Sequence, residues 1–254
     1  MLPRFAWFLT LVSGVCAAAD TWITVASRPL NSERTLAVHG WPLVTLATVG
    51  ASAMGALIIS RYPRHPIGWL FCVVGVTSAM SMVTEAFAMW HAADGRPGSM
   101  ALANVAAWIS TVFGGASSLT GLTLIFLLVP DGHLLSRRWR YVAWTSVAGF
   151  ATFLASLVLI DPTSYTIIEP ENASATAASL STIGFLLITV AMVASVTSLV
   201  IRFRRSRGRT RQQLRLIVVA GSLVAVGLAT LLVVQLFNGG KQTWAAGLPL
   251  FVSY

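Results

Sequence analysis

Seven long apolar segments, separated by short polar connections, constrain the fold of this chain more than any other feature. A helix needs about 20 mostly apolar residues to cross a hydrocarbon core about 30 Å thick. No run alternates polar and apolar residues as a membrane-spanning β-strand does. The sequence therefore predicts an all-α fold, a polytopic transmembrane helical bundle that forms a single integral-membrane domain. The seven predicted spans are residues 5–27, 41–60, 67–91, 101–129, 141–160, 179–201 and 214–237.

The two ends of the sequence affect the number of spans. A further apolar run, 243–254, would form a helix only about 18 Å long, so we expect seven full spans plus a truncated eighth. At the other end, Arg4, the apolar stretch after it and the small residues 17–19 also fit a cleavable signal peptide. Apolar residues resume after Asp20, which favours a retained first helix.

Composition agrees with a membrane protein and excludes a cytosolic enzyme. Apolar residues make up 56% of the 254 residues and charged residues only 10%, whereas soluble domains have about 25% charged residues. The net charge of +9 comes from 17 basic and 8 acidic residues. Because the arginines lie in short runs between apolar segments, they indicate membrane orientation, and no nucleic-acid partner is predicted.

The distribution of basic residues predicts a cytoplasmic N-terminus in a multi-pass protein of the cell membrane. Connections on the N-terminal side of the membrane hold thirteen basic residues, and those on the other side hold four. Cytoplasmic connections are enriched in Lys and Arg. The thirteen are Arg4, Arg61, Arg64, Arg137, Arg138, Arg140 and seven between 202 and 215, and the four are Arg28, Arg34, Arg96 and Lys241.

The densest basic run has two interpretations. Its seven arginines beside the membrane could attract anionic lipid, at about 1 kcal/mol per residue, or could only fix the topology of the flanking spans. The topological role is favoured, and the two are compatible. The seven are Arg202, Arg204, Arg205, Arg207, Arg209, Arg211 and Arg215.

Polar residues within the spans are the candidate site. Glu85 and Asp20 are the only acidic residues there, and ionisable groups in a span usually face the bundle interior or a wet cavity. An outward-opening cavity is one interpretation, with Gln235 and Asn104 as neighbours. The alternative is that each carboxylate lies close enough to the interface to reach water, or that a Ser or Thr holds it in the neutral form.

Other polar residues receive structural interpretations. No catalytic motif is found, and neither a metal nor a cofactor is predicted. The four histidines lie at predicted interfaces as anchors or turn residues, and Cys16 and Cys72 fill apolar runs. Ser110, Gly114 and Ser118 recur every four residues, a spacing that lets membrane helices approach closely.

Three connections on the predicted cytoplasmic side resemble those of one family. Together they are similar to the N-terminal multi-pass membrane (sensor) region of actinobacterial sensor histidine kinases, over about residues 41–254. These strings are His65–Leu70 (HPIGWL), Val129–Leu134 (VPDGHL) with Ser136–Arg140 (SRRWR), and Arg204–Gly208 (RRSRG) with Arg211–Arg215 (RQQLR).

The resemblance implies an input region that transmits a signal to a cytoplasmic kinase module absent from this chain, so that the chain itself is not an enzyme. Its implied partners are the lipid bilayer, a second copy in a homodimer, and a kinase module or response regulator. Two other hypotheses remain open. One is a small transporter or membrane enzyme that uses Glu85 and Asp20, although matching pairs of Pro- or Gly-broken helices are not evident. The other is a structural membrane subunit.

Overall fold

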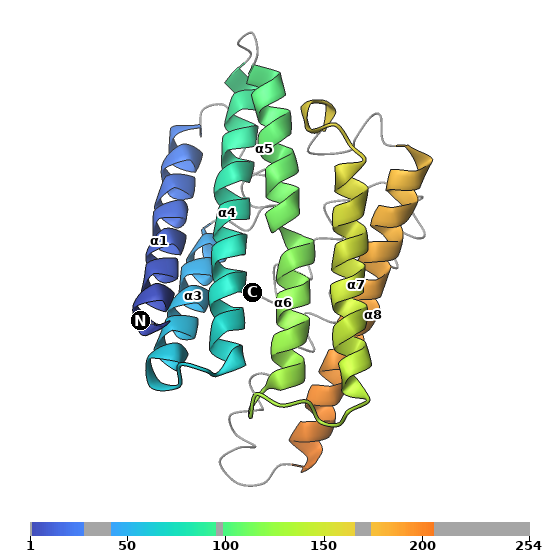
Figure 1. Cartoon of the computed structure of the whole chain (residues 1–254). Coiled ribbons are helices and arrows are strands. Elements are labelled where there is room, and N and C mark those ends of the chain that lie inside the picture. The colour runs from blue at the N-terminus through green and yellow to red at the C-terminus, as the bar shows by residue number, and fades with distance from the viewer. Residues whose placement is uncertain (1, 28–41, 95–98, 166–173, 206–254) are drawn as a thin grey trace.

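The computed structural model describes residues 2–27, 42–94, 99–165 and 174–205, and every regular element in these ranges is a helix (Figure 1). The all-α prediction is therefore confirmed for this part of the chain. The elements are α1 (Leu2–Ala26), α3 (Leu43–Arg61), α4 (Pro66–Asp94), α5 (Ser99–Phe113), α6 (Gly115–Leu128), α7 (Trp139–Val158), the short 3-10 helix η1 (Pro162–Ser164) and α8 (Ala175–Arg205).

Among the described residues, six stretches of helix are long and apolar enough to cross a membrane, and α5 with α6 counts as one of them. They correspond in order to the first six predicted spans, with ends that differ by a few residues. The predicted seventh span, 214–237, and the incomplete eighth, 243–254, lie outside the residues that the structure describes.

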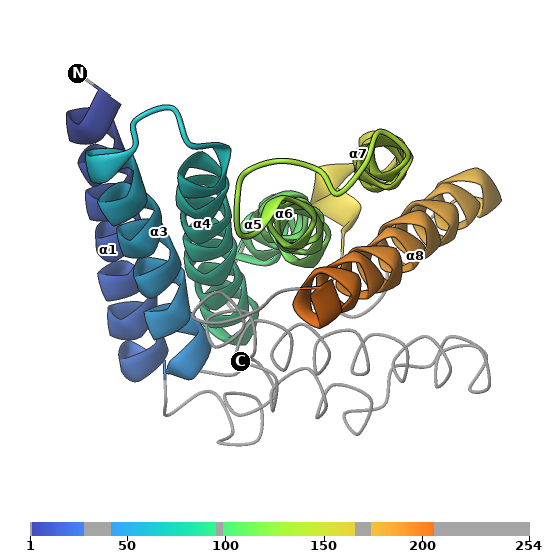
Figure 2. The same cartoon turned by 90° about the horizontal axis from the view of Figure 1, so that it is seen from below.

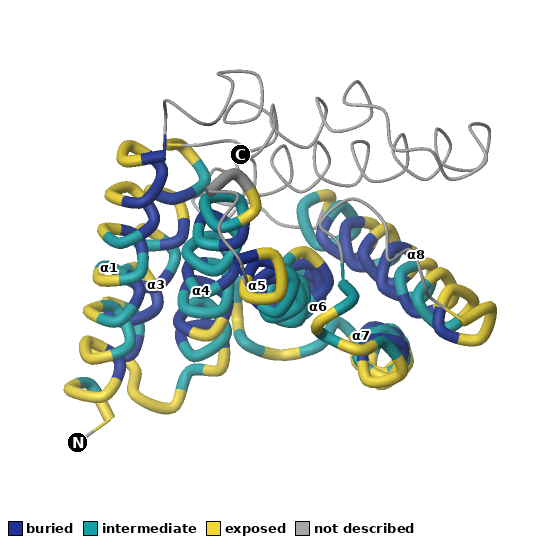
Figure 3. Tube along the Cα trace, turned by 90° about the horizontal axis from the view of Figure 1, so that it is seen from above, coloured by how far each residue is buried: buried dark blue, intermediate teal, exposed yellow. Residues whose placement is uncertain are grey.

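Many large apolar side chains lie on the outer surface, and many hydroxyl side chains are buried between the helices. Large apolar side chains such as Leu11 and Trp144 are more than 60% exposed, while Ser52 and Ser146 are fully buried. Exposed residues form outer stripes along α1, α7 and α8 (Figure 3). Exposed apolar surface on this scale is stable in a lipid environment, where small interior residues allow close packing. The chain is therefore a membrane protein.

The helices form two groups joined by a central pair. Helices α1, α3 and α4 lie together on one side, α7 and α8 lie on the other, and α5 and α6 stand between them (Figures 1 and 2). Glycines allow backbone contact within each group. A Cβ on Gly55 of α3 would lie 2.5 Å from the carbonyl oxygen of Gly68 on α4, and one on Gly149 of α7 would lie 2.8 Å from that of Gly184 on α8.

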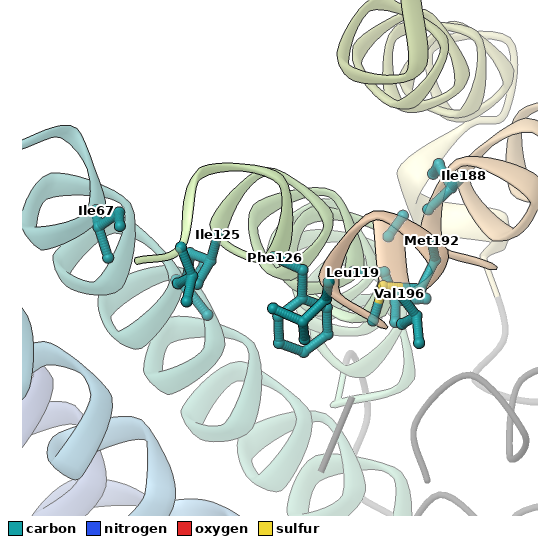
Figure 4. Close-up of a cluster of buried hydrophobic side chains, with 11 residues drawn as sticks. Ile67, Leu119, Ile125, Phe126, Ile188, Met192 and Val196 are labelled. Carbon is teal, nitrogen blue, oxygen red and sulfur yellow. The ribbon is translucent and has the colours of Figure 1, made fainter. Parts of the chain in front are cut away.

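The largest apolar cluster fills the space between α4, α6 and α8. Ile125 and Phe126 of α6 pack with Met192 and Val196 of α8, and Ile67 of α4 contributes from the opposite side (Figure 4). This cluster fixes α8 against the centre of the bundle near the end where the arginines are concentrated.

The predicted span 101–129 is divided into two helices at Gly114, and here the structure differs from the single helix expected. The amide of Gly114 bonds the carbonyl of Thr111 at 3.4 Å rather than that of Ser110. The freed Ser110 oxygen instead accepts a 3.0 Å hydrogen bond from the hydroxyl of Ser81 on α4. The break therefore persists because a neighbouring helix replaces the missing donor.

Candidate functional site

Asp20, the first predicted intramembrane carboxylate, is held between two helices. It lies on α1, is 4% exposed, and its Oδ2 accepts a 2.6 Å hydrogen bond from the hydroxyl of Thr45 on α3. A buried carboxylate requires such a partner because unmet hydrogen-bonding capacity in an apolar interior costs free energy. The burial of Asp20 argues against contact with water at the interface, and the Thr45 bond fits the other branch of that alternative, in which a Ser or Thr holds the carboxylate.

Glu85 on α4 is half-buried and lies within electrostatic range of Asp20. Its charge also acts on Tyr165, which follows η1 and points back toward the bundle. The Tyr165 hydroxyl pairs with Thr111 of α5 at 2.9 Å. Burial raises the pKa of the Tyr165 phenol, the bond to Thr111 opposes this effect, and the Glu85 charge adds to the increase in pKa. The two carboxylates and one phenol thus form a polar group that connects α1, α4 and α5.

Serine pairs connect the helix of Glu85 to both halves of the broken span. The hydroxyls of Ser81 and Ser110 lie 3.2 Å apart, and those of Ser78 and Ser118 lie 2.8 Å apart. Ser110 and Ser118 belong to the small-residue stripe predicted to pack closely, and they do pack against α4. Ser81 lies one helical turn before Glu85, so a shift of this carboxylate along α4 would also move the hydroxyl that stabilises the helix break.

The other two predicted site residues have different outcomes. Asn104 on α5 donates a 2.7 Å hydrogen bond to the carbonyl of Thr163 in η1, so it attaches the connection between α7 and α8 to the bundle. Gln235 lies outside the part of the chain that the structure describes. Within the described ranges no three His, Cys, Asp or Glu side chains form a group that could hold a metal ion.

Arg202, at the opposite end of the bundle, binds the end of α6. Its guanidinium donates three hydrogen bonds to backbone carbonyls, to Val129 at 2.8 Å, to Leu127 at 2.8 Å and to His133 at 2.6 Å. The last carbonyls of a helix lack partners within the helix, and a cation there is stabilised by the helix dipole. Arg202 therefore joins α8 to the α6–α7 connection, in addition to the topological or lipid role predicted for it.

The remaining arginines of that run differ in their placement. Arg204 is exposed, as a topological or lipid-binding residue would be. The Arg205 side chain and the residues Arg207, Arg209, Arg211 and Arg215 lie outside the described part of the chain. For these the prediction stays as it was made from the sequence.

Two of the three strings that resemble the kinase family line one groove at this arginine-rich end. The α3–α4 turn contributes Arg61, Arg64 and His65, and the α6–α7 connection contributes Asp131 and His133. Both connections lie at the lower end of the bundle in Figure 1, where α8 also ends. A Cβ on Gly132, whose φ is +74°, would lie 3.3 Å from the His65 ring, so the two connections are in direct contact.

Several partners in these two clusters were not predicted. Thr45, Thr111 and Tyr165 are ordinary in sequence, and only the packing of the helices shows that they bond or surround the carboxylates. His65 and His133 were interpreted separately as interfacial anchors, because nothing in the sequence indicates that two connections 68 positions apart meet.

Comparison of the chain with protein-family models, with curated proteins and with solved structures finds no match.

Proposed function

We propose that this chain is the membrane-embedded input region of a sensor histidine kinase and transmits a signal to a cytoplasmic kinase module. The observation that supports this best is the meeting of two of the three resembling strings at one end of the bundle. His65 contacts Gly132, and Arg202, two residues before the third string, binds the carbonyl of His133. Residues of two connections that resemble those of a signalling family thus meet each other and the end of α8.

The proposed mechanism begins at the polar group around Glu85. A change in its charge or contacts shifts α4, which bonds both α5 and α6 through Ser81 and Ser78. Helix α6 ends on Arg202, so its displacement moves α8. A bistable arrangement of this kind converts a local electrostatic event into helix motion.

The kinase hypothesis has a direct test. We expect the coding DNA beyond the Tyr254 codon, or an adjacent gene, to encode a phosphoacceptor histidine and an ATP-binding module. In membrane vesicles that contain both parts, Arg202→Met should change the rate of histidine phosphorylation several-fold, whereas Arg204→Met should not. A rate that is the same with and without the membrane region would refute the proposal.

Glu85 is the proposed point of signal input. Glu85→Gln keeps the shape and hydrogen-bonding capacity of the side chain but removes its charge. In the same vesicles we expect it to change the rate of phosphorylation several-fold, because the electrostatic effect of Glu85 on Asp20 and Tyr165 is lost. The control is Asp161→Asn, which removes a fully exposed carboxylate on the same side of the bundle. Identical phosphorylation rates for wild type and Glu85→Gln would exclude this input site.

The proposed orientation has the N-terminus in the cytoplasm. On a background without Cys16 and Cys72, an impermeant thiol reagent applied to intact cells should label a cysteine at position Ser174 but not one at position Ser206. Ser174 is exposed just before α8 begins. The reverse labelling pattern would invert the proposed topology.

A transporter is the second candidate, favoured by the helix break at Gly114 on the span that bonds to α4. Transporters bind substrates and ions where helices are discontinuous. In sealed liposomes this function would appear as cation or proton uptake that Glu85→Gln abolishes. A lack of uptake by wild type under an imposed gradient would eliminate it.

A further inference from the structure

We propose that the groove between the α3–α4 turn and the α6–α7 connection binds the phosphate group of an anionic phospholipid. The residues that line this site do not belong to the basic run 202–215, and the site does not depend on the proposed signalling function. The groove has a volume of about 650 Å³, and basic or aromatic side chains from both connections line it, among them Arg61, Tyr62, Arg64 and His133.

The two arginines of the groove have no partner among the residues that the structure describes. Arg61 and Arg64 are exposed, and among the described residues neither donates a hydrogen bond nor forms an ion pair. Arg202 differs, because three backbone carbonyls occupy its guanidinium. A guanidinium presents a planar set of donors that matches the oxygens of a phosphate. Arg61 and Arg64 are therefore available for an external anion.

The charge balance of the groove favours an anion. The acidic side chain that lines it is Asp131, whose carboxylate interacts electrostatically with Arg202 at the end of α8. Arg61 and Arg64 thus line the groove as cations, and the charge of Arg202 partly offsets that of Asp131. His65 and His133 add ring nitrogens that can donate hydrogen bonds.

The position of the groove favours a lipid over free phosphate as the source of that group. It lies at the ends of spanning helices, and two tryptophans stand beside it. Trp69 donates a 3.1 Å hydrogen bond to the carbonyl of Pro63, and Trp7 donates a 3.2 Å bond to the hydroxyl of Ser60. Tryptophans concentrate at headgroup level, and basic pockets between helix ends at this level suit anionic headgroups.

The contacts that shape the groove are built before any ligand arrives. The Trp69 bond holds the turn that bears Arg64, and Gly132 packs on the ring of His65. The groove therefore requires no folding of its own lining on binding, which lowers the entropic cost of capturing a headgroup.

The experiment measures lipid binding to the purified full chain in a non-ionic detergent by native mass spectrometry. Phosphatidylglycerol is compared with phosphatidylcholine, and inorganic phosphate is added as a competitor. The test variant is Arg61→Gln/Arg64→Gln. Its matched control is Arg137→Gln/Arg138→Gln, which removes two exposed arginines at the same end of the bundle but outside the groove.

We expect wild type to prefer phosphatidylglycerol and the test variant to bind it about thirtyfold more weakly, with less than a threefold change in the control. If the double variant does not fold, the single variants Arg64→Gln and Arg138→Gln are compared instead. We then expect Arg64→Gln to bind phosphatidylglycerol about fivefold more weakly than Arg138→Gln does. Equal losses in test and control variants would show diffuse charge attraction and overturn the site. Equal binding of phosphatidylglycerol and phosphatidylcholine would also overturn the proposed lipid site. Binding of inorganic phosphate but not of phosphatidylglycerol would overturn it as well.

Discussion

Nη1 of Arg202 on α8 lies 2.8 Å from the carbonyl oxygen of Val129, the residue that directly follows α6. The two residues are 73 positions apart in the chain. Since Leu127 and His133 accept from the same guanidinium, one side chain satisfies carbonyls from both sides of the Pro130–Gly132 turn. The Arg202 side chain thus links the end of α6, in the middle of the bundle, directly to the last part of α8, where the basic run begins.

Replacement of this arginine should destabilise the bundle. Arg202→Met keeps most of the apolar stem but leaves three carbonyls without their donor. A hydrogen bond that involves a charged group contributes about 1.5–3 kcal/mol, so we expect a loss of about 3 kcal/mol in the free energy of unfolding. Denaturation in detergent micelles, followed by circular dichroism, provides the measurement. Arg204→Met is the control, and equal stability of the two variants would contradict the bond's importance.

The helix break at Gly114 predicts a difference between adjacent glycines. A Cβ on Gly114 would lie 2.8 Å from the carbonyl oxygen of Ser110 and 3.0 Å from the Ser81 hydroxyl, whereas one on Gly115 would meet nothing within 4 Å. We expect Gly114→Ala to destabilise by about 1–3 kcal/mol, as overpacking does. Gly115→Ala should be neutral or slightly stabilising, because Ala favours helix. Unfolding midpoints of the two purified variants test this, and equal midpoints would argue against the close packing at Gly114.

The contact between α7 and α8 predicts a second pair of contrasting variants. A Cβ on Gly184 would lie 2.7 Å from both the Gly149 oxygen and the Phe153 amide nitrogen. Backbone atoms cannot rotate away, so Gly184→Ala should separate the helices at a cost of about 2 kcal/mol or more. Gly50→Ala, where a Cβ has open space, is the control. Crosslinking between cysteines on α7 and α8 should fall in the first variant only; unchanged crosslinking would refute the backbone contact.

The existence of the helices could be predicted because their length is set by the membrane, and six apolar stretches exceed that length. The break at Gly114 could not, since the Gly114-Gly115 pair lies in an apolar run and the donor that replaces the lost bond is Ser81, on another helix. A glycine in a span is as consistent with close packing of a continuous helix as with a break.

The candidate sites could be predicted only in part, because the sequence does not show which helices pack against each other. Asp20 and Glu85 were identified because a carboxylate in an apolar run is unusual wherever it lies. Their partners Thr45 and Tyr165 are common residues, and their roles depend on which helices pack together. Arg202 was interpreted from its neighbours in sequence, whereas its contacts are made across the bundle.

The titration of Tyr165 provides a test of the polar group around Glu85. Because its phenol is stabilised in the neutral form, its folded-state pKa lies above the ordinary value of about 10. This group therefore contributes stability that is fully present below about pH 10 and is lost as the pH rises through the folded-state pKa.

Absorbance of the phenolate, recorded against pH, should show a late-titrating component that disappears in Tyr165→Phe. Tyr62 and Tyr141, by contrast, are each more than 60% exposed. Glu85→Gln should shift the late component downward because a nearby negative charge is removed, whereas Asp161→Asn should leave it in place. If Glu85→Gln leaves the late component at the same pH, the charge of Glu85 does not act on Tyr165 in the manner described.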